Sequence, residues 1–193
     1  MIREAKKKRD TKETQIEISL CLDGTGKANI NTGVGFFDHM LTLFAFHSNI
    51  DLTVKAIGDL YVCDHHLVED TGILLGEVLL EALGDKRGIE RYGSARVPMD
   101  EVLTTVDIDF SGRSYLVYNC TLKRDMIGTY SCEMTSEFLR AFANNAKATL
   151  HVNCLYGEND HHKVESIFKG LGRAIKVAIK QTGTEIPSTK GMI

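Results

Sequence analysis

The segment Asp64-His65-His66-Leu67-Val68-Glu69 occurs a second time as Asp160-His161-His162-Lys163-Val164-Glu165, at an offset of 96 residues (161 − 65). The two copies hold four of the seven histidines in the chain. In a helix, residues i and i+4 share a face, so a histidine and the glutamate four positions later can bind one ion. The second histidine lies about 100° further round the helix. A single His-His pair is usually exposed surface, but its recurrence with the same spacing favours metal binding, and by two ions rather than one.

Alignment of the two halves of the chain adds one candidate ligand to each half. An offset of 98 residues (142 − 44) pairs Phe142 with Phe44, and the same offset pairs Glu137 with His39. If a pseudo-twofold axis relates the halves, the candidate ligands form two mixed sets. These sets are His65, Glu69, His162 and Glu137 in one, and His161, Glu165, His66 and His39 in the other. Nitrogen and carboxylate ligands without cysteine suit Mn²⁺, Fe²⁺, Co²⁺ or Zn²⁺ and argue against a purely structural zinc.

The composition is that of an ordinary globular protein, with 193 residues of which 43% are hydrophobic and 25% charged. A net charge of −3 gives no reason to expect nucleic acid or an anionic membrane as a partner. No apolar run approaches the ~20 residues that span a bilayer, and the basic start lacks the apolar core of a signal peptide. The five cysteines are odd in number and form no C-x-x-C pair, which indicates reduced thiols and predicts a cytoplasmic protein.

Hydrophobic periodicity places the candidate ligands on helices. In residues 1–90 we expect strands at 15–22, 28–31 and 49–57, a helix at 36–46, and a second helix from an N-cap at Asp64 to Gly84. In residues 91–193 we expect strands at 104–110, 115–119 and 149–154, a helix at 133–147, and a last helix capped by Asp160. The basic segment 6–9 is expected to be a solvated lead. Each half therefore has the order β-β-α-β-α, which predicts an α+β fold with an internal duplication in one compact domain.

Further motifs extend the pattern over the whole chain, and together they resemble imidazoleglycerol-phosphate dehydratase, the lyase family of histidine biosynthesis. The motifs are Arg9-x-Thr11-x-Glu13-Thr14, Asp23-Gly24, residues 33–41 (GVGFFDHML), both D-H-H-x-V-E copies, Arg91-Tyr92-Gly93, residues 98–101 (PMDE), Ser111-Gly112-Arg113 and residues 187–191 (PSTKG). The resemblance implies a duplicated half of the ribosomal protein S5 domain 2-like type. Each half would be a small sheet covered on one face by two helices, and the second half would carry a substrate-binding tail.

The resemblance also implies a set of site residues and a partner. Two Mn²⁺ ions per active site would be bound between subunits of a large homo-oligomer, an octahedral 24-mer. The implied ligands are His39, His65, His66, Glu69, His161, His162 and Glu165, with Glu137 where some family members have histidine. Glu13 would carry protons and contact substrate, beside the catalytic residues His65, Glu69, His161 and Glu165. The phosphate would be bound by Arg91, Arg113, Lys169, Ser188, Thr189 and Lys190.

The implied reaction removes water from D-erythro-imidazole glycerol phosphate, a small phosphorylated imidazole, to give imidazole acetol phosphate. It would pass through a dimetal-bound imidazolate and a diazafulvene-like intermediate. Two other classes use similar residues. A dinuclear metallohydrolase would release phosphate from its substrate, whereas the dehydratase would retain the phosphate on a ketone product. A metal-storage shell would need neither Arg91, Arg113 nor Lys190.

Overall fold

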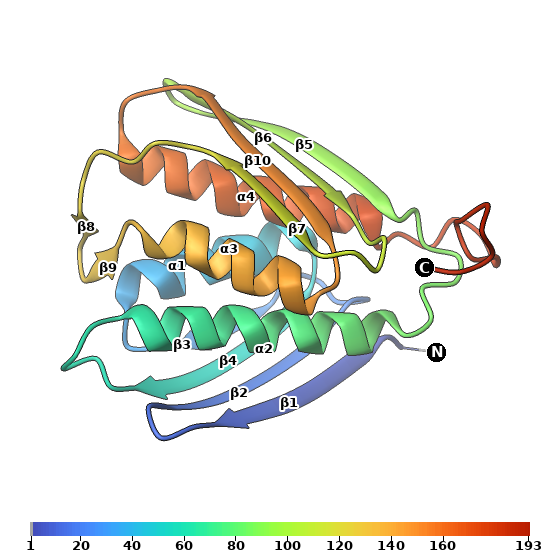
Figure 1. The fold of residues 1–193 in the computed structure, drawn as a ribbon, viewed down its shortest axis with the longest axis horizontal. Helices are drawn as coiled ribbons and strands as arrows, with labels where there is room; N and C mark the ends of the chain where they lie inside the picture. Colours follow the sequence, from blue (N-terminus) through green and yellow to red (C-terminus); the bar gives the residue numbers. More distant parts are fainter. Residues whose placement is uncertain (1) are drawn as a thin grey trace.

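The computed structural model describes residues 2–193 and contains four helices and ten strands within them (Figure 1). The first half contains β1 (Glu4–Asp10), β2 (Thr14–Cys21), β3 (Ala28–Asn31), α1 (Gly35–Ser48), β4 (Asp51–Gly58) and α2 (His65–Leu83). The second half contains β5 (Tyr92–Met99), β6 (Val102–Asp109), β7 (Tyr115–Asn119), β8 (Met126–Ile127), β9 (Tyr130–Ser131), α3 (Met134–Asn145), β10 (Thr149–Tyr156) and α4 (Asp160–Ala178).

The two halves have the same topology. One sheet has the strand order β1-β2-β4-β3 and the other has the order β5-β6-β10-β7. In each sheet the last two strands are parallel and the remaining neighbours are antiparallel. The small hairpin of β8 and β9 lies between β7 and α3 and has no counterpart in the first half. The structure thus confirms the predicted α+β fold with an internal duplication.

Each four-stranded sheet contains one strand more than the predicted order, and the second half also contains the hairpin of β8 and β9. The segment 6–9, expected to be a solvated lead, belongs to β1, which pairs with β2 along its whole length. Lys6 and Lys8 remain exposed and form ion pairs of 2.6 Å and 2.9 Å with Glu17 on β2. Lysines on an edge strand discourage pairing with other chains, and they also remove the apolar alternation by which a strand is recognised. The extra strand β5 likewise lies at a sheet edge.

The four helices lie between the two sheets (Figure 1), and they pack across the duplication, α1 against α4 and α2 against α3. Two glycines make these contacts close. A Cβ on Gly76 of α2 would lie 2.6 Å from the carbonyl oxygen of Phe142, and a Cβ on Gly172 of α4 would lie 2.7 Å from that of Phe44. Gly76 matches Gly172, and Phe44 matches Phe142, through the repeat. The same close approach of two helices therefore occurs twice.

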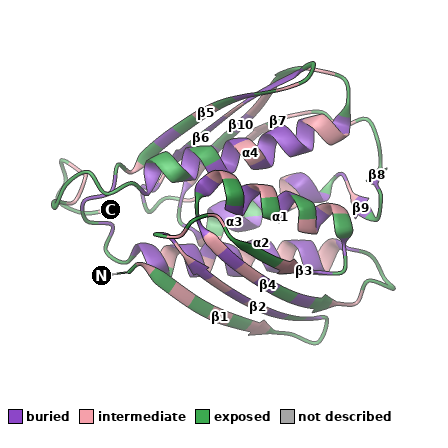
Figure 2. Cartoon of the chain, turned by 180° about the vertical axis from the view of Figure 1, so that it is seen from behind, coloured by how far each residue is buried: buried purple, intermediate pink, exposed green. Residues whose placement is uncertain are grey.

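Buried apolar side chains from both halves form one hydrophobic cluster. On β2, for example, Ile16, Ile18 and Leu20 are buried while the residues between them are at least partly accessible. Figure 2 shows the buried residues on the sides of the sheets and helices that face the middle of the molecule. Within residues 2–193, no helix combines the length and the apolar character needed to cross a bilayer. The helices that carry the repeated motif are thus held by a core common to both halves.

Candidate functional site

The repeated motif begins α4 in the second half. Asn159 caps this helix, since its side-chain oxygen accepts hydrogen bonds from the backbone N–H groups of His161 and His162. The prediction that Asp160 is the cap is therefore wrong. Its buried carboxylate points into the protein, where it accepts from the backbone N–H groups of Lys123 and Arg124, both at 2.7 Å.

Asp64, the matching residue of α2, behaves in the same way. Asp64 occupies the predicted N-cap position of α2, but its side chain makes no capping hydrogen bond. Instead its carboxylate accepts from the backbone N–H and the hydroxyl of Ser131, at 2.7 Å and 2.6 Å. Asp64 and Asp160 thus bind the same segment, residues 120–133. Both copies of the motif are consequently fixed against one connection between β7 and α3.

The structure brings together three predicted ligands from the second set. His39 of α1 and His161 and Glu165 of α4 each offer a ligand atom, and these atoms all lie within 4.8 Å of one another. The Nε2 atoms of His161 and His39 lie 3.1 Å and 3.9 Å from Oε2 of Glu165. Both imidazoles are partly exposed, whereas Glu165 is buried. Two nitrogens and one carboxylate oxygen at this spacing fit a divalent transition metal with an open side.

Lys169, a predicted phosphate ligand, lies one turn further along α4. Its Nζ is 2.5 Å from Oε1 of Glu165 and 3.4 Å from the sulfur of Met99. Burial alone would raise the pKa of Glu165, but the hydrogen bond and charge of Lys169, with the contact to His161, outweigh burial and hold that pKa below its ordinary value. Glu165 is therefore a carboxylate at neutral pH, the form that binds a metal.

The first set is more open within one chain. His65 and Glu69 of α2 face each other across one helical turn, with 3.7 Å between Nε2 and Oε2. Glu137 of α3 lies 3.4 Å from Arg140. Among residues 2–193, His39, His161 and Glu165 are the one group of three or more close metal-ligating residues, so Glu137 forms no such group with His65 and Glu69.

His66 and His162 face away from these groups and are held by carboxylates. Nδ1 of His66 lies 3.1 Å from Asp59, and Nδ1 of His162 lies 2.9 Å from Glu101. Asp59 raises the pKa of His66. The pKa of Glu101 is lowered to about 2 by the backbone N–H of Asn159 and by His162. Nε2 of His162 also lies 3.6 Å from Asp100, and neither imidazole belongs to the group of His39, His161 and Glu165, so neither predicted mixed set is completed inside one chain.

The sequence motif around Glu13 forms a turn bound to α2. Asp70, next to Glu69, accepts hydrogen bonds from Arg9 Nε at 2.8 Å and from the Thr14 hydroxyl at 2.6 Å. The Thr11 hydroxyl accepts from the backbone N–H groups of Glu13 and Thr14, which closes the turn. Glu13 projects from this turn, half-exposed, with Oε2 3.8 Å from Nδ1 of His66. Sequence reasoning missed the roles of Asp59 and Asp70, since neither belongs to a spacing that repeats.

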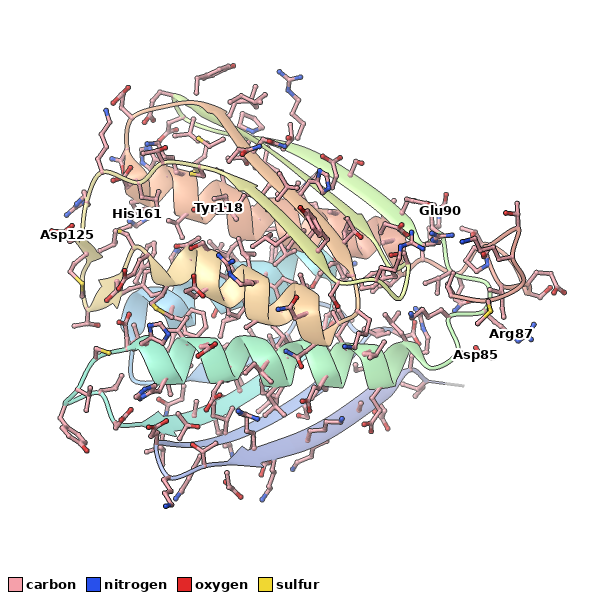
Figure 3. The ribbon with its side chains drawn as sticks, viewed as in Figure 1. Asp85, Arg87, Glu90, Tyr118, Asp125 and His161 are labelled. Atoms are coloured by element: carbon pink, nitrogen blue, oxygen red, sulfur yellow. The ribbon has the colours of Figure 1, made fainter. Side chains whose placement is uncertain are left out.

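The remaining predicted phosphate ligands lie far from the histidines. Arg91 binds Asp109 at 2.7 Å and donates to the carbonyl oxygen of Pro187 at 3.0 Å, so it holds the C-terminal tail. Its backbone N–H donates to the carbonyl of Ala178, at the end of α4. The path along α4 from His161 to Ala178 is about 25 Å at 1.5 Å per residue. Figure 3 shows His161 and Glu90, the neighbour of Arg91, at opposite ends of the molecule. The tail residues Ser188, Thr189 and Lys190, with Arg113, lie at the Arg91 end.

Comparison with known proteins agrees with these features. The sequence model described as imidazoleglycerol-phosphate dehydratase matches residues 32–175, which include both copies of the repeated motif. The chain belongs to the imidazoleglycerol-phosphate dehydratase family. A member from Clostridium botulinum is 54% identical over 190 residues, covering 98% of this chain and 97% of the relative. A member from Rhodopseudomonas palustris is 55% identical over 195 residues, covering 100% and 99%.

Solved structures of the imidazoleglycerol-phosphate dehydratase family have the same fold. The crystal structure from Staphylococcus aureus superposes with a TM-score of 0.84 at 44% identity, covering 93% of this chain and 99% of the other. The structure from Pyrococcus furiosus superposes with a TM-score of 0.85 at 40% identity, covering 97% and 100%. This chain is thus an enzyme of the imidazoleglycerol-phosphate dehydratase family along its whole length.

Proposed function

We propose that this chain removes water from imidazole glycerol phosphate to give imidazole acetol phosphate, as a step of histidine biosynthesis. Membership of the dehydratase family supports the reaction class. The observation that carries the proposal is the group formed by His39, His161 and Glu165, since it places a metal-ligand set on the repeated motif.

The proposed cofactor is Mn²⁺, with two ions per active site. The residues proposed to hold them are His39, His65, His66, Glu69, Glu137, His161, His162 and Glu165. When bound, the ions would supply Lewis-acid polarisation of the imidazole ring of the substrate. The protein's part is to present its ligands in the correct protonation state. Lys169 keeps Glu165 ionised, and the contacts of Asp59 and Glu101 with Nδ1 of His66 and His162 leave Nε2 as the nitrogen that would bind a metal.

Proton movement in the reaction requires a group that can take and return a proton near the substrate carbons. We assign this role to Glu13, because the contacts of Asp70 with Arg9 and Thr14 fix its turn against the helix that carries Glu69. Its carboxylate is half-exposed and free of a strong ion pair, so it can exchange protons with substrate and water. Arg91, Arg113, Lys169, Ser188, Thr189 and Lys190 are proposed to bind the phosphate through charge-assisted hydrogen bonds.

We further propose that the active site is assembled from several copies of the chain. A small phosphorylated imidazole cannot reach from His161 to the Arg91 end, about 25 Å along α4. Among residues 2–193, His66 and His162 also belong to no group of three close metal-ligating residues. Both observations support a site between subunits of a closed homo-oligomer, which we propose to be octahedral. We propose neither nucleic acid nor a membrane as a partner, in line with the net charge of −3. The reduced state of its thiols suits a cytoplasmic location.

The test is turnover of imidazole glycerol phosphate by purified protein that is stripped of metal and then given Mn²⁺. A ketone product that retains its phosphate, appears only with metal and is lost in Glu69→Ala would support the proposal. His151→Asn, at an exposed position of β10, is the matched control and should remain active. Release of inorganic phosphate would instead indicate a metallohydrolase. Metal binding and assembly without turnover, unaffected by Arg113→Ala, would indicate a storage shell.

A further inference from the structure

Two of the five cysteines lie side by side at the ends of neighbouring strands. Cys154 is in β10, and Cys120 directly follows β7, which is parallel to β10. Asn119 pairs with Asn153 in this ladder, so Cys120 and Cys154 form the next pair of positions. Neighbouring strands are about 4.8 Å apart, and side chains at paired positions point to the same face. This spacing lies within the range of Cα separations that a disulfide bond spans.

The two cysteines also line one cavity and can be reached from solvent. Cys120 and Cys154 both line a cavity of about 520 Å³ together with Tyr156 and Lys163. Cys154 Sγ lies 3.7 Å from the carbonyl oxygen of Tyr156, and both cysteines are partly accessible. The Nζ of Lys163, which also lines this cavity, lies 3.0 Å from Asp160 and donates to the carbonyl oxygen of Thr121.

The two thiols have different environments, and this difference decides which of them attacks a disulfide first. Cys120 packs against the hydrophobic core beside Tyr118, and burial raises the pKa of its thiol to about 12. A thiol that stays protonated is a poor attacking group. The buried hydroxyl of Tyr118 has no hydrogen-bond partner among residues 2–193. Figure 3 shows Tyr118 on β7 on the same side of the molecule as His161. Because Cys120 packs against the core whereas Cys154 lies among the accessible residues at the end of β10, we assign the first reaction to Cys154.

We propose that Cys120 and Cys154 form a reversible dithiol–disulfide site that reacts with small-molecule disulfides such as oxidised glutathione. The Cys154 thiolate attacks one sulfur of the small disulfide, breaks its S–S bond and releases one thiol. Cys120 then loses its proton to solvent and attacks Cys154 Sγ, which releases the second thiol. The two protein thiols are oxidised, and the small disulfide is reduced to two thiols.

The disulfide would act on the segment that holds both metal-binding helices. Residues 120–133 begin at Cys120 and supply the backbone N–H groups bound by Asp160 and the Ser131 contacts bound by Asp64. A covalent link from Cys120 to β10 closes a loop that contains this whole segment, and closing a loop restricts its opening. Oxidation should therefore slow hydrogen exchange in residues 121–133. A dithiol of this kind in a reducing compartment is regulatory or protective rather than structural.

The test exposes the native, fully reduced oligomer to oxidised glutathione and maps its peptides without reduction. We expect a peptide pair joined through Cys120 and Cys154, an intact mass lower by two hydrogen atoms, and full reversal by dithiothreitol. Cys120→Ser should stop at a glutathione adduct on Cys154, whereas Cys154→Ser should leave Cys120 unmodified. Cys21→Ser, which alters a half-buried cysteine on β2, is the matched control and should form the same joined pair.

Three results would overturn this proposal. The first is wild-type protein that keeps both thiols free under conditions that oxidise an exposed thiol such as Cys63. The second is a cross-link that forms only after denaturant is added. The third is glutathione on Cys120 in Cys154→Ser, which would reverse the assigned order. The wild-type mapping does not depend on the folding of any variant, and none of these readouts uses turnover.

Discussion

The ammonium group of Lys169 lies 2.5 Å from one carboxylate oxygen of Glu165, one turn earlier on α4. The other oxygen of Glu165 lies 3.1 Å from His161. Glu165 therefore joins a predicted metal ligand to a predicted phosphate ligand. A lysine in this position can stabilise the ionised form of the metal-binding carboxylate and can also attract the anionic end of a substrate.

Replacement of this ammonium should weaken both functions. We expect Lys169→Met to raise KM for the phosphorylated substrate by about 10- to 100-fold, because a charge-assisted hydrogen bond contributes about 1.5–3 kcal/mol. Its affinity for Mn²⁺ should also fall, since Glu165 would lose the charge that lowers its pKa. Lys169→Arg should restore part of the affinity for substrate and part of the affinity for Mn²⁺. Steady-state kinetics with calorimetric Mn²⁺ titration provide the measurement, and an unchanged KM would remove Lys169 from the phosphate site.

The two copies of the motif should bind metal separately. Glu165→Gln and Glu69→Gln should each reduce bound Mn²⁺ from two ions per active site to about one, because each removes a carboxylate from a different predicted set. Chelation of the wild-type protein should abolish turnover, and added Mn²⁺ should restore it. Elemental analysis of the purified variants measures the stoichiometry. Loss of both ions in each variant would show that the two sets are not independent.

The buried pair of Asp160 and Lys163 should make stability depend on acid pH. Burial raises the pKa of Asp160, but hydrogen bonds from Arg124, Lys163 and Lys123 prevail and hold it below 3.8. Its contribution to stability is therefore present above about pH 4, the pKa of an unfolded aspartate, and is lost as pH falls through the lower folded value.

Asp160→Asn should accordingly lower the free energy of unfolding at neutral pH by about 3 kcal/mol, because it leaves a buried ammonium without its partner. The difference from wild type should shrink as pH drops below 4. Denaturant titrations over this pH range test the effect. Asp85→Asn, at an exposed aspartate, is the control and should change little. A pH-independent difference would indicate that packing, not ionisation, is responsible.

The contact between Arg91 and Pro187 should order the C-terminal tail. Removal of the guanidinium in Arg91→Met breaks the bonds to Asp109 and to the Pro187 carbonyl, so limited proteolysis after Lys190 should become faster. KM should rise because Ser188 and Lys190 are no longer held. Arg96→Met, at an exposed arginine of β5, should behave as wild type in both assays. Equal cleavage rates would show that the tail is fixed by other contacts.

Much of the fold could be predicted because the sequence repeats itself. The duplicated motif and the alternation on β2 and β6 are local patterns with fixed periods, and the structure shows both. The strands β1 and β5 could not be recognised in this way, since they lie at sheet edges and carry charged or small residues. The N-cap of α4 is Asn159 and not the predicted Asp160, and Asp64 holds the N-cap position of α2 without a capping hydrogen bond, because both carboxylates bind a segment distant in sequence.

In the candidate site, the contacts that follow from helical spacing and from the repeat could be predicted. The spacing of His161 and Glu165 placed them on one helical face, and the structure shows them in contact. The approach of His39 followed from the repeat, since it faces Glu165 from a helix of the other half. The carboxylate that holds His66 could not be predicted, because Asp59 belongs to no repeated spacing, whereas Glu101, which holds His162, lies in the family motif at residues 98–101. Ligand roles and metal identity stay predictions.

The crossed packing of helices also suggests how such a chain arose. Because α1 packs on α4 and α2 on α3, one half alone would leave its helices uncovered, and a separate ancestor would have needed a second copy of itself. In that pair both sites would have been identical. After fusion into one gene, the two sites could accumulate different residues. His39 in the first half now corresponds to Glu137 in the second, and Lys169 in the second half corresponds to Ile73 in the first. A symmetric homodimer could not have placed a single ammonium beside just one of its two carboxylates.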